Sequence, residues 1–199
     1  MILKNRKAVE LSVTFIVVLI ISLVVFIGGL SLGYKFMHKA TEMKADLDRE
    51  TEAEIERLLT EGTDRVAIPI SKKTIKRDQS DVFGLGILNI ESGPFFSVKI
   101  EFDSAYKTAD KSEISAEKSF IDGAWIFGEL GPYNINNNEH KSIPILVKVN
   151  GALNSGGDPT EKGIYIFNVE VCQGVDETSS SCTGSNLYSP VLKFYVQVP

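Results

Sequence analysis

The feature that most constrains this chain is an uncharged, apolar run close to its N-terminus. Residues 11–34 (LSVTFIVVLIISLVVFIGGLSLGY) contain no Asp, Glu, Lys or Arg. A helix over these 24 residues would be about 36 Å long, and the hydrocarbon core of a bilayer is about 30 Å thick. Helices in the cores of soluble proteins rarely contain so long an uncharged run. The run therefore predicts a single transmembrane helix over residues 11–34.

The residues before this helix indicate its direction through the membrane. Lys4, Arg6 and Lys7 lie in the short tail 1–10. Positive residues beside a membrane helix tend to stay in the cytoplasm, and short tails follow this rule more closely than long domains do. We therefore expect a cytoplasmic tail over 1–10 and an extracellular C-terminal part at the cell membrane. The run is longer than the apolar core of a signal peptide and no A-x-A site follows it, which favours a retained anchor.

The start of the helix resembles a known family. The run of residues 6–11 (RKAVEL), followed by a long apolar helix, resembles the N-terminus of archaeal type IV pilin-like proteins and archaellins. In that family a peptidase removes a basic leader, the apolar helices pack in a filament core, and a β-rich head follows. The resemblance implies that Glu10 neutralises the new N-terminus of a neighbouring subunit.

A second helical pattern, rich in charge, covers residues 35–62. Its apolar residues recur mostly three or four positions apart, which predicts a narrow stripe along a charged juxtamembrane helix, or stalk. The stripe consists of Phe36, Ala40, Met43, Leu47, Ile55 and Leu58. Two interpretations stay open here. The stripe packs against another copy or a partner helix, or the helix is a solvated stalk that ends near Gly62.

From residue 66 onward the apolar pattern has a period of two, which is typical of β-strands. The predicted strands cover residues 66–70, 82–90, 95–102, 120–127, 143–149, 164–172 and 187–198. Short strands separated by turn signals predict an immunoglobulin-like antiparallel β-sandwich over 66–199, with a small open barrel as the alternative. We expect a hairpin around residues 91–94, a polar surface excursion over 103–119, and antiparallel pairing of the last two strands. Pro190 marks an edge or a bulge in the last strand.

Single residues in this region carry further expectations. Trp125 is the only tryptophan and is expected to fill the core from a strand. Gly84 and Gly86 are expected to be strand positions against which another backbone or ring packs. Tyr165, which follows Gly163 and Ile164, resembles the tyrosine corner of immunoglobulin-like folds, where the hydroxyl anchors a crossing loop.

The chain has two cysteines, Cys172 and Cys182, which flank the predicted last hairpin loop. Neither belongs to a C-x-x-C pair or lies near a histidine, which disfavours a zinc site or a redox motif. Their placement indicates a disulfide, with two unpaired thiols as the alternative. A disulfide would place the head in an oxidising, extracytoplasmic space.

Charge and motif content exclude several classes of function. The net charge of −5 arises in residues 42–61, which hold eight acidic and three basic residues. The rest of the chain is close to neutral and has no basic stripe outside the membrane flanks, so we expect no nucleic-acid binding. The two histidines, His38 and His140, belong to no metal or nucleophile motif, and we expect no enzyme activity, cofactor or metal site.

These observations together predict a non-enzymatic, single-pass membrane protein of the cell surface, pilin-like in plan. Its chain is mainly β with an N-terminal α segment, and its head has a structural or protein-interaction role. The alternative is an accessory subunit of a membrane complex that docks through the transmembrane and stalk helices. The expected partners are the lipid bilayer and, at the N-terminal helices, either a second copy or a membrane protein.

Overall fold

The computed structural model describes residues 15–24, 47, 49–128 and 130–199. The chain divides into two compact units, Met1–Ala45 and Asp46–Pro199. In the first unit, residues 15–24 form a helix, and its nine large apolar side chains are each 49% to 66% exposed. Among the described residues, no helix combines the length and apolarity that a bilayer crossing requires. The remainder of the predicted span, residues 11–14 and 25–34, lies outside the described part of the chain.

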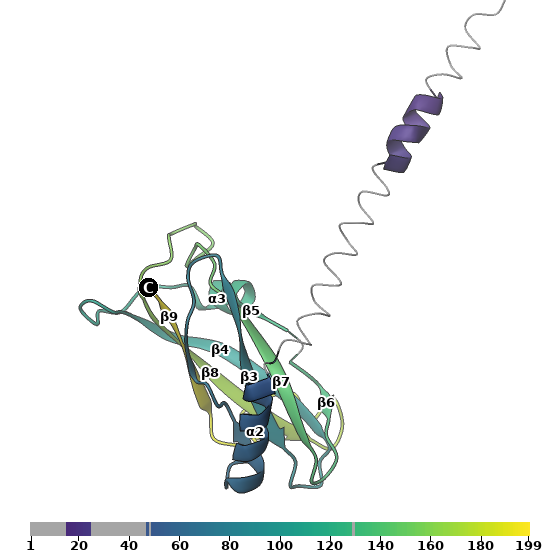
Figure 1. Cartoon of the computed structure of the whole chain (residues 1–199), viewed down its shortest axis with the longest axis vertical. Helices are drawn as coiled ribbons and strands as arrows, with labels where there is room; N and C mark the ends of the chain where they lie inside the picture. Colours follow the sequence, from purple (N-terminus) through teal and green to yellow (C-terminus); the bar gives the residue numbers. More distant parts are fainter. Residues whose placement is uncertain (1–14, 25–46, 48, 129) are drawn as a thin grey trace, which may run out of the picture. The chain divides into compact units, whose positions relative to one another are not determined.

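The second unit is a β-sandwich of two sheets (Figure 1). One sheet has the strand order β1 (Val66–Ala67), β3 (Ser80–Leu88), β7 (His140–Lys148) and β5 (Ile126–Phe127). The other has the order β2 (Lys72–Thr74), β9 (Leu192–Val198), β8 (Gly163–Gly174), β4 (Phe95–Lys107) and β6 (Tyr133–Asn134). Neighbouring strands are antiparallel, except for β2 and β9, which run parallel. The prediction of a mainly β chain with a two-sheet head is therefore confirmed, as is the antiparallel pairing of β8 with β9.

A row of aromatic side chains joins the two sheets through the core. Phe167 on β8 stacks on Phe194 of β9 with ring centroids 4.9 Å apart, and Phe194 lies 4.5 Å from Phe83 of the facing sheet. Trp125 is fully buried against Tyr165, at a centroid distance of 4.8 Å. Burial of rings of this size is a large part of the free energy that holds two sheets together.

Trp125 does fill the core, but the strand predicted over 120–127 is wrong. Residues Lys118–Trp125 form the helix α3, and only Ile126–Phe127 continue as β5. Ile121 and Trp125 are the buried residues of α3, and a spacing of four places them on one face of a helix. The predicted polar excursion over 103–119 is also shorter than expected, because β4 extends to Lys107 past a register shift after Phe102.

The predicted hairpin around residues 91–94 is wrong as well. β3 pairs with β7 while β4 pairs with β8, so the connection crosses from one sheet to the other. The buried side chain of Asn89 shapes this crossing, since its amide donates to the carbonyls of Gly93 (3.2 Å) and Ile135 (2.8 Å). Its oxygen accepts a hydrogen bond from the Glu91 N–H (2.9 Å). Turn composition indicates where the chain changes direction, whereas the strand that pairs next is chosen by packing of the whole core.

Helix α2 (Arg49–Glu61) adds a third layer on the outer face of the first sheet (Figure 1). Its buried residues Ile55 and Leu59 lie over Gly84 and Gly86 of β3. A Cβ atom on Gly86 would overlap the Ile55 side chain, and one on Gly84 would lie 2.8 Å from Thr51 Cγ2. The two glycines are thus the positions of close approach that their sequence context predicts, and the group that packs on them is a helix.

This packing corrects the predicted stalk. Within the described residues the helix spans Arg49–Glu61, after a bend at Leu47, and does not run unbroken from 35 to 62. Leu47 and Ile55 are buried in a cluster with Leu59 and Ala67 of the same head, and Leu58 packs against this cluster. Leu47 and Ile55 are therefore not available for packing against another chain.

Two further expectations concern β8. The buried Tyr165 donates a hydrogen bond from its hydroxyl to the Glu161 carbonyl (2.9 Å), four residues upstream. This is the kind of contact that defines a tyrosine corner. At the other end of β8 a disulfide joins Cys172 to Cys182, with the two Cα atoms 5.3 Å apart. The predicted disulfide is therefore confirmed, and it closes the loop between β8 and β9.

Helix α3 is held to the second sheet by a carboxylate. Asp122 accepts a hydrogen bond from the backbone N–H of Phe102, where the register of β4 shifts. Burial of Asp122 raises the pKa of its carboxyl group, and the bond from Phe102 together with the nearby Lys118 only partly opposes this shift, to which Glu101 also adds. The ionised form of Asp122 is thus disfavoured by its surroundings in the folded state.

We expect Gly86→Ala to destabilise the head by about 1–3 kcal/mol, because the added methyl group must displace Ile55 and lift α2 from β3. Gly123→Ala is the matched control, since a Cβ there meets no atom within 4 Å. In the interior of α3 the control should be neutral or stabilise by about 0.5–1 kcal/mol. Urea unfolding of the full chain measures both free energies. Equal values for the two variants would contradict the proposed packing.

We expect Asp122→Asn to be at least as stable as the wild type at neutral pH, because the amide oxygen still accepts from Phe102 without a buried charge. A raised folded-state pKa stabilises the wild type at low pH and this contribution is lost as the pH rises. The advantage of the variant should therefore shrink as the pH falls toward about 4.

The exposed Asp110 is the control with the opposite sign, because bonds from Ser112 lower the pKa of its carboxyl group. Its contribution to stability is present at neutral pH and is lost on acidification. Urea titrations of Asp122→Asn and Asp110→Asn over a pH series measure both effects. The same pH trend in the two variants would contradict the raised pKa of Asp122 and the lowered pKa of Asp110.

Candidate functional site

The described residues show only some of the predicted assembly residues. Glu10, Phe36, Ala40 and Met43 lie outside the described part of the chain, so their roles stay predictions. The head itself offers a different candidate, which the sequence did not single out.

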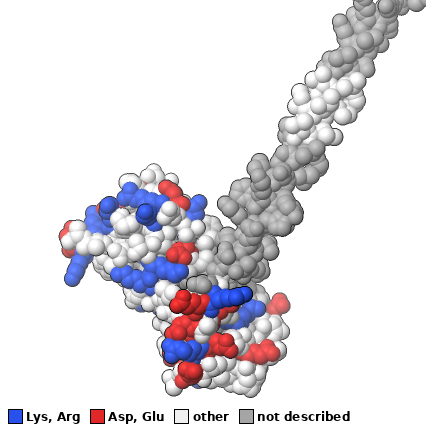
Figure 2. Space-filling model, in the orientation of Figure 1, with Lys and Arg blue, Asp and Glu red and all other residues white. Residues whose placement is uncertain are grey.

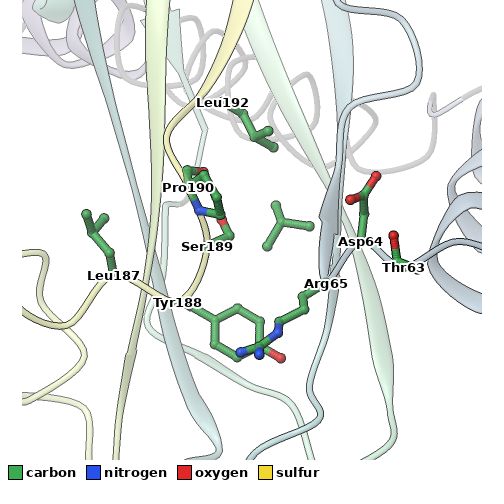
Figure 3. Close-up of a pocket in the computed structure, with 9 residues that line it drawn as sticks. Thr63, Asp64, Arg65, Leu187, Tyr188, Ser189, Pro190 and Leu192 are labelled. Atoms are coloured by element: carbon green, nitrogen blue, oxygen red, sulfur yellow. The ribbon is translucent and has the colours of Figure 1, made fainter.

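A hollow of about 430 Å³ lies between the segment that leads into β1 and the segment that leads into β9. It is lined by Thr63, Asp64, Arg65, Val66, Leu187, Tyr188, Ser189, Pro190 and Leu192. Figure 3 shows the two segments on opposite walls, with Arg65 and Tyr188 meeting at one end and Leu192 at the other. We call this hollow the slot. Each wall belongs to a different sheet of the sandwich.

Tyr188 closes one end of the slot and connects the two sheets. Its hydroxyl donates to the carbonyl of Leu88 (2.6 Å) and accepts from the N–H of Ile90 (3.0 Å). Its ring packs edge-on against Phe96, with centroids 5.0 Å apart. Burial raises the pKa of the Tyr188 phenol, so the hydroxyl keeps its proton and its role as a donor at neutral pH.

Arg65 lies over Tyr188 at the same end. Its guanidinium carbon is 5.5 Å from the centroid of the Tyr188 ring, and one of its nitrogens pairs with the carboxylate of Glu91. The cation–π contact and the ion pair hold the Arg65 side chain in place although it is partly exposed. Arg65 therefore forms a polar boundary at one end of a slot that polar and apolar residues both line.

The two walls of the slot are sheet edges. On β9, Tyr195 donates from its N–H to Ser71 (2.7 Å), and Gln197 accepts from Ile75 (3.0 Å). Alternate residues of a strand point their backbone groups to the same side. The backbone groups of Lys193 therefore face the same edge, where β2, which begins at Lys72, no longer covers it.

The facing wall has the same character. Leu88 donates from its N–H to the Arg65 carbonyl (2.8 Å), which orients the backbone of Arg65 toward β3. The adjacent Val66 consequently turns its N–H and C=O away from β3 and toward the slot, which it also lines. Both walls thus present backbone groups at a sheet edge.

Some exposed apolar residues belong to the segments that form or contact the slot. The second unit has seven exposed large apolar residues among those described. Leu187 lines the slot, and Val191 lies between the lining residues Pro190 and Leu192. The N–H of Ile90 donates to the Tyr188 hydroxyl, and Ile70 precedes Ser71, which bonds to β9. Exposed apolar side chains that gather around a concave site are typical of a binding surface.

The slot has little that could carry out chemistry. The Ser189 hydroxyl donates to the carbonyl of Pro190 (3.1 Å) and not to a side chain that could act as a base. Within the described residues no group of three or more His, Cys, Asp or Glu side chains could hold a metal ion.

The charges of the head do not favour one sign on the visible surface. Acidic and basic side chains are interspersed over the face of the second unit that Figure 2 shows. Several form ion pairs, among them Lys73 with Asp81 (2.9 Å) and Lys193 with Asp103 (2.9 Å). Mixed surface charge of this kind contributes to solubility more than to stability.

The sequence carried one weak signal for the slot. Pro190 was expected at an edge or a bulge, and residues 189–191 do interrupt the pairing of the last segment with β8 between Tyr188 and Leu192. Arg65 and Tyr188 could not be found in this way, because they are 123 positions apart in the chain and meet only through the fold.

Comparison with known proteins adds little. No protein-family model and no curated protein matches the chain. Among solved structures, a PapD-like domain (domain 7) of human CEP192 is similar over 68% of this chain and 85% of its own, with 12% identity and a TM-score of 0.43. A family 123 glycoside hydrolase from Clostridium perfringens is similar over 75% of this chain and 25% of its own, also with 12% identity and a TM-score of 0.43. Neither likeness carries an inference about function.

We expect Tyr188→Phe to lower the free energy of unfolding by about 1–3 kcal/mol, because Leu88 and Ile90 lose their hydrogen-bond partner. Tyr195→Phe is the matched control. The hydroxyl of Tyr195 has no partner among the described residues, and its loss should change stability by less than about 0.5 kcal/mol. Thermal and urea unfolding measure both variants. A neutral Tyr188→Phe would show that the hydroxyl does not link the two sheets.

Proposed function

We propose that this chain is a non-enzymatic, single-pass membrane protein that presents its β-sandwich head to protein partners outside the cell. The observation that carries the proposal is the apolar helix of residues 15–24, whose nine large apolar side chains are all largely exposed. A helix that is apolar on every side is stable only where other apolar groups or lipid surround it. This helix lies within the uncharged run of residues 11–34, whose 24 residues are enough in number for a helical membrane crossing.

Two features support an extracellular head. The Cys172–Cys182 disulfide is favoured in an oxidising space, and the short tail with Lys4, Arg6 and Lys7 favours a cytoplasmic N-terminus. A cytoplasmic N-terminus and an extracellular head require that the chain crosses the membrane between them.

We further infer that the head is immunoglobulin-like. The order β1-β3-β7-β5 corresponds to strands A, B, E and D of that fold, and β9-β8-β4 corresponds to G, F and C. Tyr165 lies at the start of the strand that corresponds to F, where the tyrosine corner is found. Domains of this architecture commonly serve as recognition modules, which supports a binding role for the head.

In the pilin-like plan, copies associate laterally through their apolar helices, and Glu10 neutralises the N-terminus of a neighbour. The burial of Leu47 and Ile55 in the head removes these two residues from such association. In the alternative, the chain is an accessory subunit that docks through its stalk. Leu47 and Ile55 are not available for that docking either.

We expect the full-length protein to stay in the membrane fraction after alkaline extraction, and Leu19→Arg to release much of it. An arginine at the centre of a membrane helix costs about 2.5–3.5 kcal/mol of insertion free energy. Val175→Arg in the exposed loop of the head is the matched control and should remain membrane-bound. Wild-type protein that stays dissolved without detergent as a monomer would overturn the proposal.

The same extract tests the pilin-like plan. Intact mass analysis should find the basic leader removed in that plan, and an intact Met1 would leave an anchored protein without filament assembly. Protease treatment of whole cells should cleave the head and spare the tail.

A further inference from the structure

We propose that the slot binds an extended segment of a partner polypeptide, which adds a strand to the open edge of β9. The segment would carry apolar side chains at alternate positions. This inference rests on the proposed function, in which the head meets other proteins.

The backbone of the slot specifies the kind of partner. The N–H of Val66 has no acceptor among the described residues, although Val66 is only 4% exposed. Buried backbone N–H and C=O groups are nearly always paired. On β9, Lys193 adjoins the lining residue Leu192 and turns its N–H and C=O groups toward the edge that β2 leaves uncovered. Backbone N–H donors and C=O acceptors therefore alternate along each edge. The backbone of an extended peptide offers C=O acceptors and N–H donors at the matching positions.

The chain's own strands leave this edge open. Pro69 follows β1 and cannot donate to a ladder, and the chain then crosses to the second sheet, where β2 pairs with β9 only from Lys72 onward. Residues 189–191 lie between two paired stretches of the opposite wall and widen the gap. Neither neighbour can therefore close the slot.

A second open strand edge in the same head, that of β3, is capped by charged side chains. β3 extends beyond the two residues that β1 covers, and there Lys73 donates from its Nζ to the Val82 carbonyl (2.7 Å). Asp81 pairs with the same Nζ (2.9 Å) and accepts from the Val82 N–H (2.7 Å). Charged side chains that cap an edge are a common protection against unwanted strand pairing. The edge of β9 beside the slot lacks such a cap among the described residues.

Side chains around the slot define which segment fits. Leu187 and Val191 are exposed apolar residues of the wall that leads into β9, and Arg65 over Tyr188 limits the slot at one end. Its volume of about 430 Å³ is within the range of protein binding sites. In strand addition, backbone bonds supply affinity and pockets for alternate side chains supply specificity. A short run with alternate apolar residues meets both requirements.

A second copy of this chain fits less well. The strand edges that would have to enter the slot, those of β1 and β9, already face each other across the slot of their own head. Symmetric pairing of two slots would need each edge to leave its own wall. We therefore assign the slot to a segment from a different polypeptide.

The probe is a capped peptide of sequence Thr-Val-Thr-Val-Thr-Val, added to the full-length protein in detergent micelles with the disulfide intact. We expect saturable binding and slower hydrogen exchange at the amides of Val66 and Lys193. A second peptide with N-methyl groups on alternate residues keeps the side chains and loses the backbone donors. It should bind at least about tenfold more weakly, which is about 1.4 kcal/mol. Equal binding of the two peptides would overturn the proposal.

Ser189→Trp should fill the slot and reduce binding of the first peptide at least about tenfold. Ser185→Trp, in the exposed loop before the slot, is the matched control and should bind like the wild type. Thermal unfolding of both variants shows that the head is folded.

Unchanged binding to folded Ser189→Trp would place the site elsewhere and overturn the proposal. Hydrogen-exchange protection of the Val66 amide that rises with protein concentration in the absence of peptide would identify a second copy as the occupant. That result would also overturn the proposal. None of these results depends on membrane extraction, so a failure here is distinct from a failure of the membrane anchor.

Discussion

The organisation of the head depends on the close contact between α2 and β3. Because Gly84 and Gly86 have no side chains, Ile55 and Leu59 approach the strand and bury the apolar face of the helix. The helix has an otherwise charged surface, so without this contact it would have little reason to lie on the sheet. Its docking also determines where the chain emerges at Gly62, and thereby places residues 63–66 as one wall of the slot.

The two sheets meet at a corner where strand edges would otherwise be open. Two kinds of side-chain contact stabilise the head at this corner. Lys73 and Asp81 cap β3 with charged side chains, while Tyr188 ties the end of the last segment to Leu88 and Ile90. Between these two fixed points the chain crosses from one sheet to the other near Pro69. The slot lies beside this crossing, and Tyr188 closes one of its ends. Its position is therefore a consequence of how the sandwich changes sheets, and the exposed apolar residues of one wall make it a candidate for recognition.

The two compact units differ in where their apolar side chains lie. The described helix of the first unit, residues 15–24, has nine large apolar side chains that are each 49% to 66% exposed, whereas the head buries its apolar groups in a core made of both sheets. The disulfide joins the buried Cys172 of β8 to Cys182 in the loop that follows.

Much of the head could be predicted from the sequence, because its signals are local. Alternation along 143–149 and 164–172 identifies β7 and β8, since a strand with one buried face repeats every two residues. The placement of Cys172 and Cys182 identifies the disulfide, and Tyr165 after Gly163 identifies the tyrosine corner. Trp125 was correctly expected in the core, but a short apolar stretch with mixed spacing does not distinguish a helix from a strand.

What the sequence by itself determined is the apolar segment, the β character of the head and its disulfide, because each depends on neighbouring residues or on composition. Only the tertiary structure decided that β3 and β4 belong to different sheets, that Leu47 and Ile55 belong to the head, and that Arg65 meets Tyr188. These outcomes depend on which distant surfaces bury one another. Local spacing can indicate that a residue needs a partner, but the partner is selected by the packing of the whole chain.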